Sequence, residues 1–178
     1  MKVEDFNFKI MRQLYFFFFL VLVGCKPTQE VVSVDNAFFV AERIEIWSYP
    51  NREIWHREGE DNMGALKELK IENGKVNIEK NNIKEKIILS KEQIEKTYQT
   101  LYDNKICDYE SIATCYQPRH LIVFLNSEDE VFNVLEICLS CTQIQSINKF
   151  NYPDLCDTKM NKLEKVFKSF GIKYFDEK

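Results

Sequence analysis

Residues 119–126 read RHLIVFLN, residues 131–138 read VFNVLEIC, and residues 127–130 between them read SEDE. Both outer stretches are rich in β-branched and aromatic residues, which favour strands. A short polar connection between two such stretches is typical of a β-hairpin. The sequence therefore predicts two antiparallel strands at the centre of the fold.

The sequence allows three registers for the pairing of these two strands, which differ by one residue each. The middle register places Arg119 opposite Cys138. A slip one way pairs Cys115 with Cys141, and a slip the other way pairs His120 with Cys138. In each register, Cys115, His120, Cys138 and Cys141 gather at the open end of the hairpin.

Further elements surround this hairpin. An Asn-Gly pair between alternating apolar residues indicates a second, smaller hairpin. Ser90 followed by Gln93 is a capping box that starts a helix, and Gly171 is placed to end another. The predicted elements are strands at 37–49, 54–57 and 83–89, a loop at 59–64, a hairpin at 69–78, and helices at 90–102 and 158–170. We expect Asp157 to cap the second helix. We expect the lysines of that helix to face solvent for the most part.

These elements predict an α+β domain, an antiparallel sheet with two helices packed on one face. The chain has 178 residues and a net charge of −4. Its length suits one domain, and a mildly acidic chain without a basic block lacks the electrostatic footprint of a nucleic-acid-binding protein. Nucleotide, metalloprotease and serine-hydrolase motifs are absent from the sequence.

The N-terminal region resembles an export signal. Residues 11–25 read MRQLYFFFFLVLVGC, in which Arg12 supplies positive charge and residues 14–23 form an apolar run. That run suits a secretory signal and is too short to span a bilayer as a helix. The final Leu-Val-Gly-Cys resembles a bacterial lipobox, and in lipoproteins of that kind the cysteine after the cleavage site carries the lipid. Here that residue would be Cys25.

The domain boundaries follow from this interpretation. Residues 1–24 are a predicted signal peptide, with Met11 a more natural start than Met1 because Glu4 and Asp5 are unusual in a basic leader. Residues 25–36 are a predicted lipidated cysteine and tether, and residues 37–178 a single domain. Lys26 after the cysteine resembles the sorting pattern of enteric outer-membrane lipoproteins, so we expect a domain in the periplasm or at the cell surface.

Five cysteines follow Cys25: Cys107, Cys115, Cys138, Cys141 and Cys156. The first hypothesis for them is structural disulfides, which persist in an oxidising compartment. A short loop such as one from Cys107 to Cys115 would contribute about 2–3 kcal/mol. Five cysteines leave at least one thiol free or paired elsewhere.

The second hypothesis is a redox site at Cys138 and Cys141. These residues form a C-x-x-C that follows a strand and precedes a possible helix over residues 142–148. A helix N-terminus there would lower the pKa of the thiols. The local order is thioredoxin-like, but no βαβ pattern surrounds it.

The third hypothesis is a zinc site. Cys115, His120, Cys138 and Cys141 supply three thiolates and one imidazole, enough for a closed tetrahedral site. Export argues against zinc, because thiols there tend to oxidise before they meet metal. We therefore expect no cofactor, with zinc as the alternative.

An aromatic group lies near Pro50 and contains Trp47, Tyr49, Trp55 and His56. Exposed, it could bind sugars or a protein. Burial against one end of the sheet is the favoured interpretation, since aromatic side chains are usually at least half buried. The candidate binding residues are Arg119, His120, Trp47 and Trp55.

Two segments carry a resemblance to a known group of proteins. Residues 115–124 read CYQPRHLIVF, residues 135–141 read LEICLSC, and residues 170–174 read FGIKY. This pattern resembles small envelope lipoproteins of Bacteroidetes-type bacteria, over about residues 107–175. That group has no assigned activity, so the resemblance implies an envelope lipoprotein and no catalytic roles. We expect a non-enzymatic role, binding an envelope protein or a secreted enzyme, with thiol-redox and zinc-binding roles as alternatives.

Overall fold

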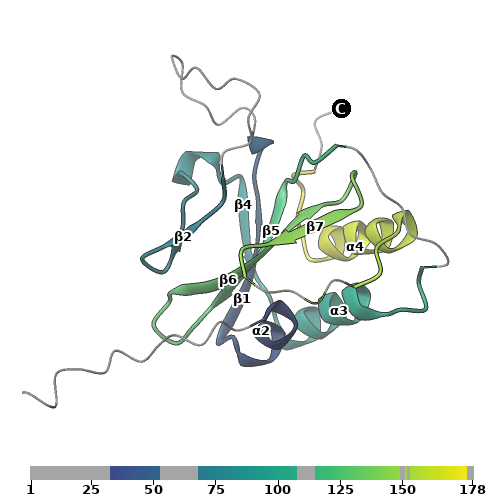
Figure 1. Ribbon diagram of the computed structural model, residues 1–178, viewed down its shortest axis with the longest axis horizontal. Helices are drawn as coiled ribbons and strands as arrows, with labels where there is room; N and C mark the ends of the chain where they lie inside the picture. The colour runs from purple at the N-terminus through teal and green to yellow at the C-terminus, as the bar shows by residue number, and fades with distance from the viewer. Residues whose placement is uncertain (1–32, 53–67, 108–114, 149–150, 152, 176–178) are drawn as a thin grey trace, which may run out of the picture. The chain divides into compact units, whose positions relative to one another are not determined.

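The computed structural model describes residues 33–52, 68–107, 115–148, 151 and 153–175 (Figure 1). The predicted export signal, Cys25 and most of the tether lie outside these residues. So do Trp55, His56, the predicted strand at 54–57 and the loop at 59–64. In the described part of the chain, no helix has the length and apolar character needed to cross a membrane.

The described domain is α+β, as predicted. Five antiparallel strands form its main sheet in the order β4-β1-β5-β6-β7. Their bounds are Arg43–Ser48 for β1, Glu85–Ile88 for β4, His120–Leu125 for β5, Val131–Cys138 for β6 and Gln143–Ser146 for β7. The predicted central hairpin is β5 and β6, and β1 lies beside β5.

The register of β5 and β6 is the middle one of the three considered. His120 pairs with Ile137, and the pairing continues without a slip to Phe124 and Asn133. The register then shifts by one residue, so that Leu125 pairs with Val131. This bulge lies at the turn, and the open end of the hairpin keeps the predicted pairing.

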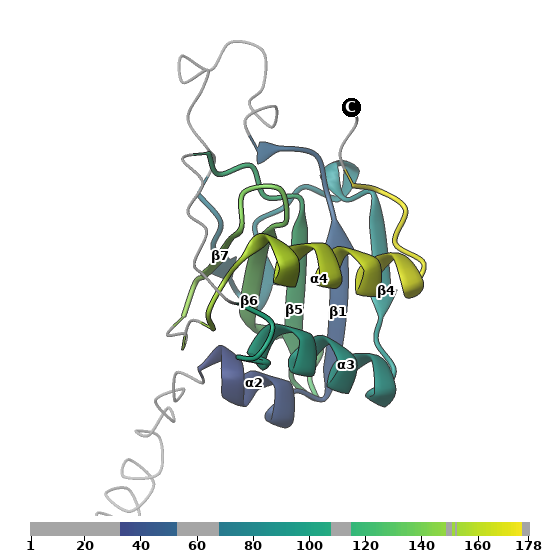
Figure 2. The ribbon, with the colours of Figure 1, turned by 90° about the vertical axis from the view of Figure 1, so that its right-hand side faces the viewer.

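Three helices cover one face of the sheet (Figure 2): α2 (Val34–Val40), α3 (Lys91–Tyr102) and α4 (Asp157–Ser169). The prediction of a strand from residue 37 and of a tether up to residue 36 was wrong at α2. Val34, Ala37 and Phe38 are buried at helical spacing, and the β-propensity of the aromatic run concealed that period. Ser90 and Gln93 form the predicted capping box of α3.

Helix α4 differs from its prediction in two details. Its N-cap is Cys156 rather than Asp157. Lys159, expected on the solvent side, is fully buried and its Nζ donates a 2.9 Å hydrogen bond to the Leu101 carbonyl at the end of α3. The buried lysine therefore joins the ends of α3 and α4. Gly171 follows the helix with φ of 99°, as expected for a residue that ends one.

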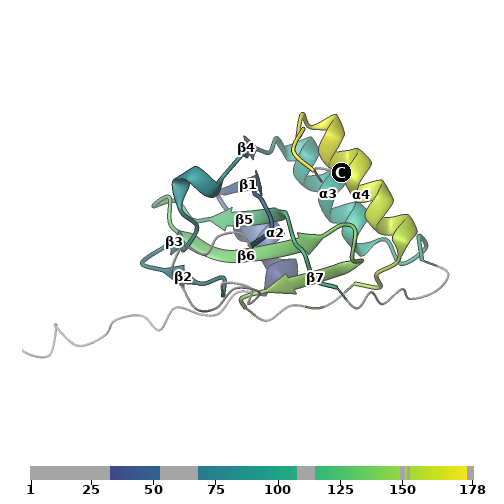
Figure 3. The same ribbon diagram turned by 90° about the horizontal axis from the view of Figure 1, so that it is seen from above.

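A small hairpin packs on the opposite face of the sheet (Figure 3). It consists of β2 (Ile71–Glu72) and β3 (Lys75–Val76), followed by the 3-10 helix η2 (Lys80–Asn82). Asn73 and Gly74 both have positive φ, as the predicted tight turn requires. The amide of Val131 donates to the Gly74 carbonyl over 2.7 Å, so this turn is attached to the start of β6.

Alternation along the strands divides the core between the two faces. Ile122, Phe124, Leu135 and Ile137 pack against the helices. Leu121, Val123 and Val134 pack beneath the small hairpin. Alternate residues of a strand therefore lie on opposite faces of the sheet. A cysteine can contact His120 only if it lies on the same face.

Candidate functional site

Three cysteines lie together at the open end of the β5–β6 hairpin. Cys138 ends β6 and forms a disulfide with Cys141, three residues later. Cys115 is a free, exposed thiol, and its Sγ lies 3.5 Å from Cys141 Sγ. We call Cys115, Cys138 and Cys141 the three-cysteine site.

Accessibility differs sharply within this site. Cys138 and Cys141 are both fully buried, whereas Cys115 is exposed. The amide of Gln117 approaches Cys141 Sγ to 3.2 Å. An N–H donor in that position stabilises negative charge on the sulfur, which favours Cys141 as a thiolate when its disulfide opens.

A buried carboxylate holds the segment that carries Cys115. Glu136, on β6, accepts hydrogen bonds from Tyr116 Oη at 2.9 Å and from Tyr49 Oη at 2.6 Å. Arg52 forms an ion pair with the same carboxylate at 2.7 Å. Burial, reinforced by the Glu136 charge, raises the pKa of Tyr49 well above its usual value, so this hydroxyl stays protonated as a donor.

Tyr116 lies between Cys115 and Gln117 in the chain, and both of these neighbours contact Cys141. Its attachment to Glu136 therefore positions both groups over the disulfide. Glu136 and Cys138 are two residues apart in β6 and point to the same face of the sheet. The anchor and the disulfide thus share one rigid strand.

His120 does not join the cysteines. It pairs with Ile137, and its ring packs beside Phe167 and Phe175 on the helical face. Cys138 follows Ile137 in β6 and so points to the other face. The predicted gathering of four zinc ligands is wrong for this reason, and over the described ranges no three or more His, Cys, Asp or Glu side chains form a metal-binding group.

His120 is a buried, neutral side chain. Burial lowers the pKa of its imidazole to about 4, although its hydrogen bond to the Tyr174 carbonyl opposes this shift. Since a carbonyl only accepts, Nε2 carries the proton and donates it over 3.0 Å. His120 therefore fastens the segment after α4 to the sheet.

Cys107 and Cys156 form the second disulfide. It joins the segment after α3 to the N-cap of α4. The expected disulfides are present as two cysteine pairs, with Cys115 as the thiol left over, but the example of Cys107 with Cys115 was wrong. The strand β7 occupies the place of the helix expected over residues 142–148, so no helix N-terminus acts on the C-x-x-C.

The two disulfides differ in how much they constrain the unfolded chain. The residues of the Cys107–Cys156 bridge are 49 apart in sequence, and those of the Cys138–Cys141 bridge 3 apart. Loop-closure entropy gives about 4 kcal/mol for the first and about 2 kcal/mol for the second. The long bridge therefore suits a structural role better than the short one.

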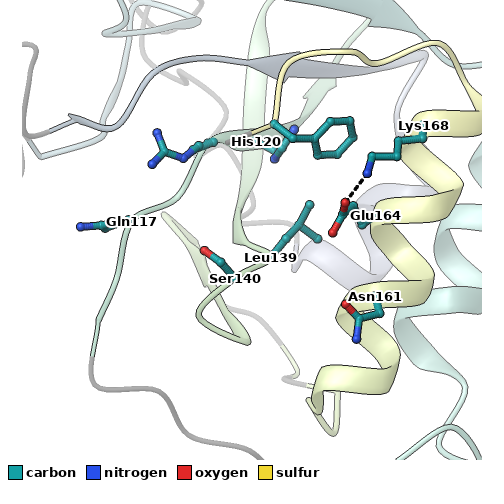
Figure 4. Close-up of a pocket in the computed structure, with 9 residues that line it drawn as sticks. Gln117, His120, Leu139, Ser140, Asn161, Glu164 and Lys168 are labelled. Carbon is teal, nitrogen blue, oxygen red and sulfur yellow. Dashed lines mark hydrogen bonds and ion pairs between the residues drawn. The ribbon is translucent and has the colours of Figure 1, made fainter. Parts of the chain in front are cut away.

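A pocket of about 570 Å³ adjoins the turn between Cys138 and Cys141 (Figure 4). Leu139 and Ser140 of that turn form one wall, and Glu164 with Lys168 on α4 forms the other. Arg119 and His120, both predicted as binding residues, also line it. Two of the predicted binding residues therefore meet at one concave surface.

Trp47 is separate from this pocket. It lies on β1, its side chain is largely buried, and its indole donates to Glu45 over 2.7 Å. The favoured interpretation of a buried aromatic is confirmed for Trp47 and Tyr49.

Sequence reasoning missed the residues that position the site: Tyr49, Arg52, Tyr116, Gln117 and Glu136. Only Glu136 carried a signal, as a carboxylate inside an apolar strand, because a buried charge needs a partner. The partners come from distant segments that no local pattern connects to it.

No protein-family profile, curated protein or solved structure matches this chain.

Proposed function

We propose that this protein carries out thiol–disulfide exchange in the bacterial cell envelope, at the three-cysteine site. The observation that carries the proposal is the 3.5 Å contact between the free Cys115 thiol and Cys141 of the Cys138–Cys141 disulfide. Disulfides exchange when a thiolate attacks one of the two sulfurs. The attacking group and the target are adjacent here.

The first step is internal. The Cys115 thiolate attacks Cys141 Sγ, a Cys115–Cys141 bond forms, and the Cys138–Cys141 bond breaks. Cys138 leaves with the electron pair and takes up the proton that Cys115 released. No electrons are gained or lost, and the disulfide has moved from two buried sulfurs to a pair that contains an exposed one.

The second step oxidises a substrate, for which we propose a dithiol on an exported protein. One substrate thiolate attacks Cys115 Sγ, which forms a mixed disulfide and releases Cys141 as a thiolate. The second substrate thiolate then attacks the substrate sulfur of the mixed disulfide and releases Cys115. Two electrons and two protons pass from the substrate dithiol to the protein.

The surroundings suit these steps. The Gln117 amide stabilises the Cys141 thiolate that the second step releases. The Tyr116–Glu136 hydrogen bond keeps Cys115 close to its target. The short bridge contributes about half as much to stability as the long one, so the domain loses less when the site is reduced than when the Cys107–Cys156 bridge opens.

The test is the reaction of the oxidised full chain with excess glutathione, quenched with acid, alkylated and read by peptide mass spectrometry. We expect wild type to carry glutathione on Cys115 and to lose the Cys138–Cys141 bridge, while Cys107–Cys156 stays closed as an internal control. We expect Cys115→Ala to open the short bridge at least ten-fold more slowly.

Two results would overturn the proposal. One is a Cys115→Ala variant that reacts at the wild-type rate, since Cys115 would then play no part. The other is a short bridge as resistant as Cys107–Cys156, which would make it structural. Zinc bound to the reduced chain at one per molecule would favour the metal alternative instead.

The location is a proposal that rests on the sequence of residues 11–25, which ends in the lipobox cysteine Cys25. We expect wild type to incorporate labelled fatty acid and to fractionate with the outer membrane. We expect Cys25→Ser to lose the label. Label retained by Cys25→Ser would contradict this part alone.

A binding role for an envelope protein or secreted enzyme is the second candidate, favoured by the 570 Å³ pocket that Arg119 lines. In that case, Arg119→Gln releases a partner that co-purifies with wild type. The reaction with glutathione would be the same in both proteins. This separates the two candidates.

A further inference from the structure

A second concave surface lies at the other end of the β5–β6 hairpin from the cysteines. It is a groove of about 640 Å³ between the small hairpin with η2 on one side and strands β1 and β4 on the other. Its floor is apolar and includes Trp47, Val76, Ile83 and Leu125. We call it the lysine groove, because Lys75, Lys80, Lys84 and Lys86 line it.

The groove is a fixed feature of the fold. The turn at Gly74 is hydrogen-bonded to Val131, and a Cβ at Gly74 would lie 2.7 Å from Glu130 Cβ. The close contact, together with the positive φ of Gly74, requires glycine there. The small hairpin is therefore seated tightly on the main sheet, and the groove beside it does not depend on a loose segment.

The carboxylates that line the groove are already engaged. Glu45 accepts from Arg43 and from the Trp47 indole. Asp129 is paired with the same Arg43. Glu85 accepts from Ser48 and from the amides of residues 173 and 174. These acids are therefore poor partners for further cations.

The four lysines, by contrast, form no ion pair within the described part of the chain. All four are exposed at the residue level. Lys86 places its Nζ 3.5 Å from the centre of the Trp47 ring. With Arg43, the four lysines outnumber the three lining carboxylates, so the groove has a net formal charge of +2 in a chain of net charge −4.

The electrostatics of Lys86 show that these charges interact. Partial burial lowers the pKa of its ammonium group and the Glu45 charge opposes this shift, while the like charges of Arg43 and Lys80 lower the pKa further. Arg43 and Lys80 therefore repel Lys86. A bound anion would relieve this repulsion, so anion binding is favoured by the charge distribution itself.

We infer that the lysine groove binds a small anion with two or more phosphate or carboxylate groups. Four lysines around an apolar floor suit an organic anion, and the volume lies in the range of small-molecule sites. Such a group could belong to a free metabolite or to a lipid headgroup. The inference is independent of the thiol chemistry, because it uses none of the cysteines.

The test is calorimetric titration of the full chain with tripolyphosphate at low and high salt. The variant is Lys80→Gln with Lys84→Gln, two exposed positions at the groove. The matched control is Lys162→Gln with Lys165→Gln on the exposed side of α4, which changes the net charge equally. Unfolding curves verify that both double variants are folded.

We expect the affinity of the control variant for tripolyphosphate to lie within two-fold of that of wild type. We expect the affinity of the groove variant to be at least ten-fold lower. High salt should weaken binding. No binding by wild type, or the same loss in both variants, would overturn the inference. Inorganic pyrophosphate and a soluble short-chain prenyl pyrophosphate, which share a two-phosphate group, distinguish the sources. Tighter binding of the lipid indicates a headgroup, and equal binding indicates a free anion.

Discussion

Tyr116 Oη donates a 2.9 Å hydrogen bond to Glu136 Oε2, and this bond joins the segment that carries Cys115 to the strand that carries Cys138. The same carboxylate also binds Tyr49 and Arg52. The segment that carries Cys115 is therefore attached to a buried network on the sheet.

Tyr116→Phe is expected to slow the opening of the Cys138–Cys141 bridge by glutathione, because Cys115 then spends less time near Cys141. Loss of a hydrogen bond to a charged group costs about 1.5–3 kcal/mol. The measurement is the rate of bridge opening together with the free energy of unfolding. Tyr102→Phe is the control, since Tyr102 Oη has no hydrogen-bond partner within the described ranges. Equal rates in the two variants would contradict a positioning role for Tyr116.

The two disulfides are expected to differ in their contribution to stability. Replacing Cys107 and Cys156 by Ala lowers the free energy of unfolding by about 4 kcal/mol, and replacing Cys138 and Cys141 by about 2 kcal/mol. Urea unfolding without reductant measures both. A larger loss for the short bridge would make it the main structural bond.

His120 gives the stability a pH dependence. The pKa of the folded-state imidazole is about 4, against an ordinary value of 6.5. Its contribution is therefore present above pH 6.5 and is lost as the pH falls toward 4, by about 3 kcal/mol at most. Urea unfolding from pH 7 to pH 4 should show a flatter dependence for His120→Gln than for wild type. Parallel curves for the two proteins would contradict this.

Lys159→Met is expected to lower the free energy of unfolding by about 1–3 kcal/mol. The Leu101 carbonyl at the end of α3 loses the donor that Lys159 Nζ supplies. Lys162→Met, on the exposed side of the same helix, is the matched control and should change stability by less than about 0.5 kcal/mol. Urea unfolding of both variants measures the difference.

Local signals in the sequence predicted much of this fold. The Asn-Gly turn, the Ser90–Gln93 capping box and the central hairpin each depend on residues close in the chain, and all three are confirmed. Two short segments were assigned to the wrong secondary structure because their local propensities point elsewhere. The aromatic residues of α2 favour a strand, but the segment is a helix. The polar segment at β7 was expected to be a helix, but it is a strand. In β7, pairing with β6 outweighs local preference.

The site was predictable only in part. The gathering of Cys115, Cys138 and Cys141 at the open end of the hairpin was predicted in all three registers, because it needs only the central hairpin. The separation of His120 from the cysteines depends on which face each residue occupies, and the three possible registers place it differently. The Glu136 network joins residues more than 80 positions apart, such as Tyr49 and Glu136, and single-sequence patterns hold no information on such pairs.

The Cys107–Cys156 bridge closes a loop of chain that contains β5, β6 and β7. Every cysteine of the exchange site lies inside that loop. A protease that cuts the backbone once between Cys107 and Cys156 would thus leave both fragments on one molecule, and they would separate only after reduction. After limited proteolysis, a reducing gel should therefore show two fragments. A non-reducing gel should show a single band at the mass of the intact chain.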